Sequence, residues 1–337
     1  MASDVKTSVL KSSPQKKQRV GVLNRTAPIR WFAFAAICFG IAGGIVYHCV
    51  DRESIWSIAI TTVDSPFDVT DVSSTLQPTL TAADVTDVEA RFVADPFLLS
   101  HNGQWTVFFE VLNEGTGHGD IGCATSEDGK KWRYGRIVLD EPFHLSYPSV
   151  YVVDDEVFMV PESYESGGVR LYKAVDFPNR WSLEKTLVQG DSLADPTLFE
   201  HDGHWWMFTG KPGTHDELRL FVSDAIDGAW TEHPKSPLIS RDPSRSRPAG
   251  KVIAYNGRLF RVAQDCSSRY GGAVRVFEIK SLTTSDYVEQ ECAATLLRAQ
   301  ASEWNSHGMH HIDAARLPNG RWIVCVDGHR KQFAWKH

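Results

Sequence analysis

The stretch Ala94–Glu110, ADPFLLSHNGQWTVFFE, decides the fold, because it recurs as ADPTLFEHDGHWWMFTG at Ala194–Gly210. Both copies consist of an extended run, an Asn-Gly or Asp-Gly pair, and a second run rich in aromatic residues. Such a pair between two extended runs is a strong signal for a β-hairpin. A hairpin that recurs along a chain indicates a repeat architecture.

Three further segments repeat the pattern, namely Tyr147–Ser163, Arg247–Asp265 and His311–Gly328. Prolines near the first four starts are spaced by 52, 48 and 52 residues. Between the hairpins, a second repeat ends in Trp132, Trp181 and Trp230, each 49 residues from the next. Four strands in about 50 residues are typical of a β-propeller blade. The five hairpins therefore predict an all-β, five-bladed propeller, with the regular tryptophans packed between blades.

The charge of the chain is divided unevenly. Residues 1–50 hold seven Lys and Arg and one Asp, a net charge of +6, which leaves −13 for the rest of a chain whose total is −7. An acidic body argues against nucleic acid as the partner, because phosphate binding needs a basic face.

The stretch WFAFAAICFGIAGGIVYHCV at residues 31–50 contains no formally charged residue. About 20 such residues span a bilayer as a helix, and the basic flank places the N-terminus in the cytoplasm. The alternative is a cleaved signal peptide, for which both the basic and the apolar segments are long. We therefore expect a single N-terminal transmembrane helix that interacts with the lipid bilayer and leaves the propeller extracytoplasmic, in a periplasm or a secretory lumen.

These observations divide the chain into four parts. We expect a basic cytoplasmic tail at residues 1–30, a signal anchor at 31–50, a linker at 51–90 and the propeller at 91–337. Within the linker, SIWSIAI at residues 54–60 could supply a strand that closes the ring and removes an exposed sheet edge.

The body contains four cysteines, Cys123, Cys266, Cys292 and Cys325. An even number in an oxidising compartment permits two disulfides, and four buried thiols are the equal alternative. The chain has no CxxC motif, so we expect no zinc site and no cofactor.

Propeller geometry predicts where the polar residues meet. The first strand of each blade lines the central channel, and its start lies beside the end of the second strand. The predicted starts carry Asp95, Tyr147, Asp195, Arg247, His310, His311 and Asp313, and the predicted ends carry Glu110, Glu162, Asp265 and Asp327. One mouth of the channel should therefore collect several carboxylates, an arginine and two histidines.

Clustered carboxylates suit glycoside chemistry, in which one acid protonates the leaving oxygen and another acts as base or nucleophile. Our candidates for these roles are Asp95, Glu162 and Asp195. Calcium binding, recognition of hydroxyl groups without turnover, and a structural role for Asp before Pro are the alternatives.

The remaining candidates are substrate-binding residues, namely Tyr147, Arg247, Asp265, His310, His311 and Asp313. Arg247 lies in a basic loop and suggests an anionic group in the ligand, with a solvated loop as the alternative. Adjacent residues on a strand point to opposite faces, so at most one of His310 and His311 should face the channel.

Four runs, which begin at Arg91, His144, Ser246 and His310, together resemble the N-terminal domain of plant glucosamine inositolphosphorylceramide transferases. The resemblance covers about residues 54–330 and implies a five-bladed propeller similar to arabinanase- and levansucrase-like glycosidases. In those glycosidases a base or nucleophile Asp opens the first blade, a position that Asp95 matches. In the plant proteins a membrane anchor precedes the propeller, and sugar transfer is assigned to a separate C-terminal glycosyltransferase domain.

This chain ends at His337, so we expect it to lack that domain, and the transferase activity does not carry over. Two hypotheses remain. The first is a membrane-anchored enzyme acting on a glycoside or glycolipid headgroup. The second is a non-catalytic glycan-binding or scaffolding domain that assists a separate glycosyltransferase. A third hypothesis is a structural propeller that binds a protein partner.

Overall fold

A computed structural model describes residues 50–190, 193–292 and 295–335. The predicted tail at 1–30 and the predicted anchor at 31–50, apart from its last residue, lie outside the described residues. Within those three ranges, no helix has the length and apolar character needed to cross a membrane. The chain divides into two compact units, and the larger one, Arg52–Gln332, holds the propeller.

Five antiparallel sheets form the blades of a propeller, so the predicted all-β, five-bladed fold is confirmed. The first blade comprises β2 (Ala90–His101), β3 (Gln104–Asn113), β4 (Gly119–Ser126) and β5 (Arg133–Leu139). The second comprises β6 (Ser146–Val153), β7 (Glu156–Glu162), β8 (Gly168–Asp176) and β9 (Arg180–Gln189).

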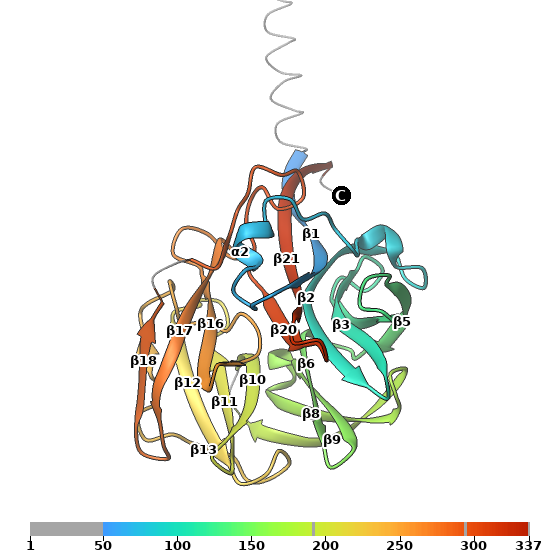
Figure 1. Cartoon of the computed structure of the whole chain (residues 1–337). Helices are drawn as coiled ribbons and strands as arrows, with labels where there is room; N and C mark the ends of the chain where they lie inside the picture. The colour runs from blue at the N-terminus through green and yellow to red at the C-terminus, as the bar shows by residue number, and fades with distance from the viewer. Residues whose placement is uncertain (1–49, 191–192, 293–294, 336–337) are drawn as a thin grey trace, which may run out of the picture. The chain divides into compact units, whose positions relative to one another are not determined.

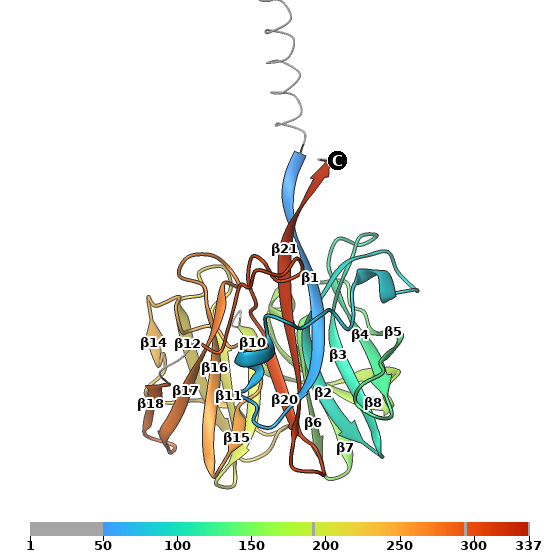
Figure 2. The ribbon, with the colours of Figure 1, turned by 45° about the horizontal axis from the view of Figure 1, so that its top comes forward.

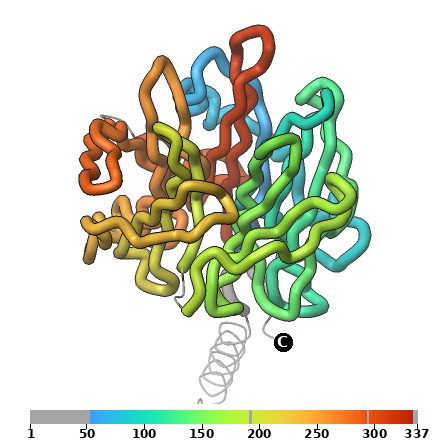
Figure 3. Tube along the Cα trace, turned by 90° about the horizontal axis from the view of Figure 1, so that it is seen from below, coloured from blue at the N-terminus to red at the C-terminus, as the bar shows by residue number. Residues whose placement is uncertain are grey.

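The third and fourth blades each carry a short additional strand. The third comprises β10 (Ala194–His201), β11 (His204–Gly210), β12 (Glu217–Ser223), β13 (Thr231–Glu232) and β14 (Ile239–Ser240). The fourth comprises β15 (Ile253–Tyr255), β16 (Arg258–Asp265), β17 (Ala273–Leu282), β18 (Tyr287–Glu291) and β19 (Leu297–Arg298). Figure 3 shows that the chain passes around the ring in sequence order.

The fifth blade joins the two ends of the described chain. Its strands are β20 (Ile312–Arg316), β21 (Trp322–Trp335) and β1 (Val50–Val63), in that order from the inside. Figures 1 and 2 show β1 beside β21, although more than 250 residues separate them in the chain. The stretch SIWSIAI lies within β1, so this segment occupies the outer edge of the last blade.

The segment after β1 contains more structure than its polar composition indicates. The short helix α2 (Val69–Val72) and the 3-10 turn η1 (Ala82–Asp84) lie in the predicted linker, and a second 3-10 turn, η2 (Tyr164–Ser166), follows β7. Val69 is fully buried and packs into the core between the fourth and fifth blades. Part of the expected linker therefore belongs to the propeller core.

Five apolar clusters hold the ring together, one at each interface between neighbouring blades. Trp181 of the second blade joins the cluster shared with the first, and Trp230 of the third joins the cluster shared with the second. Trp132 of the first blade packs against the cluster shared with the fifth. The regular tryptophans thus pack between blades, as their spacing predicts.

The cysteines do not form disulfides among the described residues. Cys123 and Cys325 are buried thiols, and Cys266 and Cys292 are partly buried thiols. The propeller is therefore held by packing between blades and by the closing strand β1.

Candidate functional site

The first strands of three blades share a backbone feature at one end of the channel. Asp95, Tyr147 and Asp195 have φ angles of 51°, 48° and 51°, and each lies in a β-bulge that interrupts the pairing of its strand. A non-glycine residue in this region costs of the order of 1–3 kcal/mol and persists only where its surroundings hold it. The repeat therefore places a strained residue at the same point of three successive blades.

An acid from the preceding blade holds two of these strained residues. The backbone N–H of Asp95 donates to Oδ2 of Asp327 at 3.0 Å, and that of Asp195 donates to Oε2 of Glu162 at 2.9 Å. Asp327 lies in β21, and Glu162 is the last residue of β7. An acid in the second strand of one blade thus fixes the strained residue in the first strand of the next blade.

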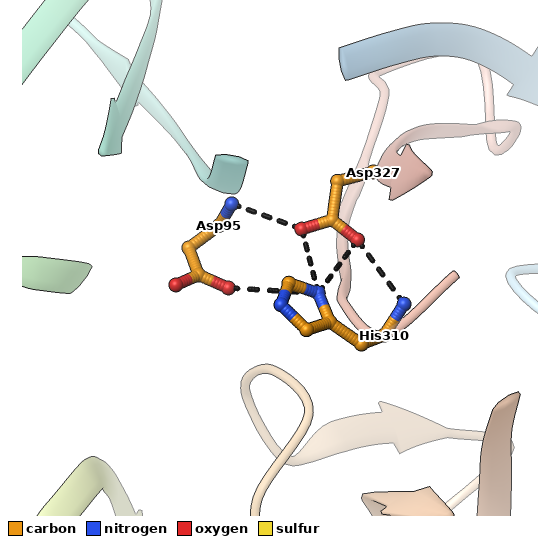
Figure 4. A group of neighbouring side chains, drawn as sticks. All are labelled: Asp95, His310 and Asp327. Atoms are coloured by element: carbon orange, nitrogen blue, oxygen red, sulfur yellow. Dashed lines mark hydrogen bonds and ion pairs between the residues drawn. The ribbon is translucent and has the colours of Figure 1, made fainter. Parts of the chain in front are cut away.

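Asp95, His310 and Asp327 form a buried group at the junction of the fifth and first blades (Figure 4). His310 Nδ1 lies 2.9 and 2.8 Å from the two carboxylate oxygens of Asp327 and 3.9 Å from Oδ1 of Asp95. The ring of His310 stacks on Trp56 of β1 with a centroid distance of 3.9 Å.

The protonation of this group follows from its burial and charges. Burial raises the pKa of Asp95 to about 7, an effect that the neighbouring His310 partly offsets. Burial opposes the charge of His310, but Asp327 and then Asp95 raise the pKa of this imidazole above its usual value. Although burial also works against ionisation of Asp327, His310 and the surrounding N–H donors lower its pKa to about 2. Asp95 is therefore the carboxyl whose protonation changes near neutral pH.

His311 also faces Asp95, with 3.7 Å between Nδ1 and Asp95 Oδ1. Both rings therefore lie beside Asp95, which strand alternation does not predict. Strand alternation does not apply, because β20 begins only at Ile312 and the backbone N–H groups of both histidines donate to Asp327 Oδ1. Burial lowers the pKa of His311 to about 4, so this ring is neutral at neutral pH.

Asp195 forms the second charged group, with Arg247 and Glu162. Nε and Nη2 of Arg247 donate to the two oxygens of Asp195 at 2.5 and 3.1 Å, and Nη2 lies 3.6 Å from Oε2 of Glu162. Burial alone would raise the pKa of Asp195, but Arg247 and the other donors hold it below its usual value. Burial and the neighbouring charge of Asp195 raise the pKa of Glu162 well above its usual value. Arg247 thus favours the ionised form of Asp195, whereas burial and the charge of Asp195 favour the protonated form of Glu162.

Glu110, at the equivalent position of the first blade, completes the acidic mouth. Its Oε1 lies 3.5 Å from Nε2 of His144, and His144 Nδ1 accepts the backbone N–H of Gly119 at 2.9 Å. Because Nδ1 accepts that bond, the proton of a neutral His144 ring sits on Nε2 and points toward Glu110. Burial and the nearby Asp95 and Glu162 raise the pKa of Glu110 well above its usual value.

A polar pocket of about 320 Å³ opens beside Glu162 and Arg247. Tyr270 forms part of its rim, is 42% exposed, and lies with its ring 5.1 Å from the guanidinium carbon of Arg247. The pocket is lined by His144, Glu162, Tyr164, Glu165, Ala194, Pro212, Gly213, His215, Arg247 and Tyr270. Its volume lies at the lower end of the range for small-ligand sites.

Three predicted binding residues have polar atoms that are already hydrogen-bonded within the protein. Asp265 accepts hydrogen bonds from the backbone and hydroxyl of Ser267 in its own turn, at 3.0 and 2.6 Å. Asp313 is buried and accepts the backbone N–H of Leu98 at 2.8 Å. The hydroxyl of Tyr147 is enclosed by two partners, which are Thr197 Oγ1 and the N–H of Gly250.

These positions have physical causes. Asp265 ends β16, where a following serine captures the carboxylate in a turn. Asp313 is the second residue of β20 and therefore lies deeper in the channel than the histidines before it, where Lys251 Nζ lies 3.3 Å away. The tyrosine contributes to the channel wall through its buried ring.

The sequence pattern misses several residues of the site, among them His144 and Tyr164. Tyr270 and His215 lie outside the repeated hairpins, and Gln264, which donates to Asp195 Oδ2 at 3.3 Å, is one position before the acid that the pattern selects. The pattern predicts Asp327 and Glu110 at the mouth as strand ends, although β21 and β3 continue beyond them.

The buried group of Figure 4 has the residue types of a metal site, but its atoms are already engaged. Oδ1 of Asp327 accepts three N–H groups, and Oδ2 accepts the N–H of Asp95. The ligand atoms left are few, since among the described residues only Oδ1 of Asp95 in this group is buried without a hydrogen-bond partner. The donor set fits a hydrogen-bonded acid–histidine–acid group better than a metal centre.

The fold is that of glycoside hydrolase propellers. It resembles an exo-β-1,3-galactanase from Clostridium thermocellum, with 14% identity and a TM-score of 0.51 over 62% of this chain and 51% of that one. It also resembles the catalytic domain of an α-L-arabinofuranosidase from Coprinopsis cinerea, with 12% identity and a TM-score of 0.53 over 70% of this chain and 90% of that one. At this identity the likeness shows the fold alone.

The chain belongs to the family described as glucosamine inositolphosphorylceramide transferase 1, N-terminal, whose model matches residues 49–329. It is 35% identical over 345 residues to the protein named glucosamine inositolphosphorylceramide transferase 1 from Oryza sativa subsp. japonica. This match covers 91% of this chain and 46% of the rice protein. The protein of the same name from Arabidopsis thaliana is 35% identical over 304 residues, 83% of this chain and 40% of its own length. The predicted resemblance is confirmed, and the chain spans less than half the length of these relatives.

Proposed function

We propose that this protein is a carbohydrate-active propeller that acts on a glycoside or a glycolipid headgroup at the mouth of its channel. The observation that carries the proposal is the repeated arrangement at the channel mouth, where Asp327 holds the backbone of Asp95 and Glu162, at the pocket, holds that of Asp195. Burial raises the pKa of Glu162 well above its usual value and that of Asp95 to about 7, so the two carboxyls differ in their tendency to keep a proton. Glycoside hydrolysis needs one carboxyl of each kind. The glycosidase-like fold and the transferase family both support a carbohydrate ligand.

In this proposal Glu162 gives its proton to the glycosidic oxygen, and Asp95 acts as base toward water or as nucleophile. A pKa near 7 suits Asp95 to this role, since a catalytic base works best when its pKa lies near the operating pH. Asp195 is less suited to donate a proton, because Arg247 keeps it ionised. Its paired charge instead helps to keep Glu162 protonated.

A binding function without turnover is the second candidate. Asp95 is only 5% exposed, and Arg247 already holds a carboxylate within the protein, which leaves it poorly placed to take an anionic ligand. Tyr270 and Tyr164 on the pocket rim offer aromatic surface for a sugar. In this role the propeller would present a glycan or glycolipid to a separate glycosyltransferase, in keeping with the name of its relatives.

The proposed setting is a membrane. The uncharged stretch at 31–50 and its basic flank support a single-pass protein with a cytoplasmic N-terminus and an extracytoplasmic propeller. Extraction of membranes with alkaline carbonate should leave the full chain in the pellet. In sealed vesicles whose cytoplasmic face is outermost, added protease should spare the propeller until detergent opens the vesicles. Release into the supernatant would contradict the anchor.

The decisive test combines a glycan array with a hydrolysis assay on the purified full chain. Turnover that is lost in Asp95→Asn and in Glu162→Gln, but kept in the exposed control Glu184→Gln, supports the enzyme. Glycan binding with no product, retained in Asp95→Asn, supports the binding function instead. Failure of both assays would contradict the carbohydrate proposal.

A further inference from the structure

A second cluster of possible metal ligands lies away from the buried group of Figure 4, on the first blade. His118, Asp120 and Asp140 each offer one possible ligand atom, and these atoms lie within 4.8 Å of one another. His118 precedes β4, Asp120 lies within it, and Asp140 follows β5. Two neighbouring strands of one sheet therefore bring the three together.

Asp120 supplies the feature that points to a ligand. The residue is only 1% exposed, and its Oδ2 accepts a hydrogen bond from Nδ2 of Asn113 at 2.8 Å. Its Oδ1 is buried and has no hydrogen-bond partner among the residues that the structure describes. A buried carboxylate oxygen without a partner is costly, and a second carboxylate beside it adds repulsion. A cation between Asp120 and Asp140 would remove both costs.

The spacing suits a coordination sphere better than a hydrogen bond. Nδ1 of His118 lies 3.3 Å from Oδ1 of Asp120 and 3.4 Å from the carbonyl oxygen of Gly119, both long for an imidazole hydrogen bond. Two ligands that are each about 2.1 Å from a zinc ion lie roughly 3.0–3.5 Å apart. The separation of His118 from Asp120 is of this size.

The turn that carries His118 is held in place independently of any ion. The backbone N–H of Asn113 donates to the carbonyl of His118 at 3.1 Å, and that of Gly117 donates to the carbonyl of Asn113 at 2.8 Å. The side chain of Asn113 in turn bonds Asp120. Asn113 thus orients both the histidine turn and the buried carboxylate, so two of the three ligands are preorganised.

We propose that His118, Asp120 and Asp140 bind a first-row divalent cation of the Zn²⁺ or Mn²⁺ kind. One imidazole nitrogen and two carboxylate oxygens match ions that accept both donors, with water completing the shell on the exposed side of Asp140. Because the Gly119 N–H donates to His144, the ion would also fix the backbone that sets the tautomer of His144 beside Glu110. The bound cation therefore positions one wall of the pocket.

The test uses the full chain, stripped of metal with a chelator, and titrates it with Zn²⁺ by calorimetry and with Mn²⁺ by electron paramagnetic resonance. We expect one strong site per chain and at least a tenfold loss of affinity in His118→Ala and in Asp140→Asn. Asp140 is exposed and its replacement by Asn removes the repulsion with Asp120, so this variant should melt no lower than the wild type without metal. The surface control Glu184→Gln should bind as the wild type does.

Two further readouts keep the result unambiguous. Asp95→Asn should keep the site, and a loss of binding in that variant would instead assign the ion to the buried group of Figure 4 and overturn the proposal. Zn²⁺ should shift the imidazole nitrogen resonances of His144 in the wild type but not in Asp140→Asn. Absence of a stoichiometric site, or affinity unchanged in both ligand variants, would also overturn it. None of these readouts uses a sugar, so they stand apart from the proposed function.

Discussion

The two halves of the channel mouth use the same backbone device with opposite electrostatic results. In one half, Asp327 holds the N–H of Asp95, and the nearest cation is His310. In the other half, Glu162 holds the N–H of Asp195, and the nearest cation is Arg247. The pKa of Asp95 is raised to about 7, whereas that of Asp195 is lowered.

The difference arises from the cation and from where its hydrogen bonds go. Arginine is always charged and gives both of its parallel N–H groups to Asp195 itself. His310 gives its Nδ1 hydrogen to Asp327 and lies 3.9 Å from Asp95, which receives little compensation for its burial. The Arg247 half is therefore a fixed structural charge pair, and the His310 half is the part whose charge responds to pH.

Removal of Arg247 should produce the largest effect on stability. Arg247→Ala leaves the buried carboxylate of Asp195 without its partner, and breaking a buried pair in this way costs about 3–5 kcal/mol. Urea denaturation monitored by tryptophan fluorescence measures the loss. Arg258→Ala, at a side chain that is 63% exposed, is the matched control and should change stability by less than about 0.5 kcal/mol. Equal losses in the two variants would mean that Asp195 is not held by its pair.

Asp95→Asn should change stability in the opposite direction. The carboxyl of Asp95 ionises near pH 4 in the unfolded chain but near 7 in the folded one, so the unfolded chain releases its proton first and stability falls as pH rises from 4 to 7. The amide removes this cost. The variant should therefore gain roughly 1–3 kcal/mol at pH 8 and nothing at pH 4.

Parallel urea titrations of the variant and wild type at pH 4, 6 and 8 check this. Asp195→Asn, which breaks the arginine pair, is the control and should destabilise at every pH above 4. A pH-independent difference between Asp95→Asn and wild type would contradict the raised pKa.

The repeat explains why so much of this mouth can be predicted from the sequence. The residues before the repeated prolines lie in or near the first strand of their blades, so Asp95 and Asp195 could be assigned to one face from their equivalent places in the repeat. The pairing of charges could not, because it depends on side chains that reach across blades. Arg247 reaches Asp195 across the third blade, where Gly210 stands at the position that holds Glu110 and Glu162 in the first two. A Cβ at Gly210 would lie 3.3 Å from Pro248, so the missing side chain leaves room for that segment.

The two histidines show a second limit of the pattern. Strand alternation predicts opposite directions for them, but alternation holds only within a strand. Their position just before β20 lets Asp327 bind both backbones and turn both rings toward Asp95. Tyr270 lies in the loop between β16 and β17, where the repeat carries no signal.

Substitution of Trp56 tests whether the closing strand β1 affects the pKa of His310. Its ring lies between His310 and His329, at centroid distances of 3.9 and 4.1 Å. Trp56→Phe should cost about 1 kcal/mol and lower the pKa of His310, because a smaller ring stabilises the imidazolium less. Because the pKa of His310 is raised on folding, this residue adds stability that is present below about pH 6.5 and is lost as the pH rises through its pKa in the folded protein. In the variant this pKa is lower, so the same stability should be lost at a lower pH.

Proton NMR titration of the His310 ring measures the shift in pKa. Trp205→Phe removes a tryptophan that packs against Tyr151 instead, and it should leave His310 unchanged. An identical pKa of His310 in wild type and Trp56→Phe would show that the closing strand β1 does not influence the charge of His310.

Tyr270 should show the smallest effect on stability and decides whether the two halves form one site. Its ring lies 5.1 Å from the guanidinium carbon of Arg247 and 5.3 Å from the ring of His310, so it contacts both halves while remaining 42% exposed. Tyr270→Ala should cost less than about 1 kcal/mol of stability but weaken glycan binding about tenfold, since it removes the aromatic surface at the rim. Tyr270→Phe keeps the ring and should bind nearly as the wild type does. If Tyr270→Ala binds a glycan as well as the wild type, the sugar does not lie across Arg247 and His310, and the fixed and responsive halves serve separate purposes.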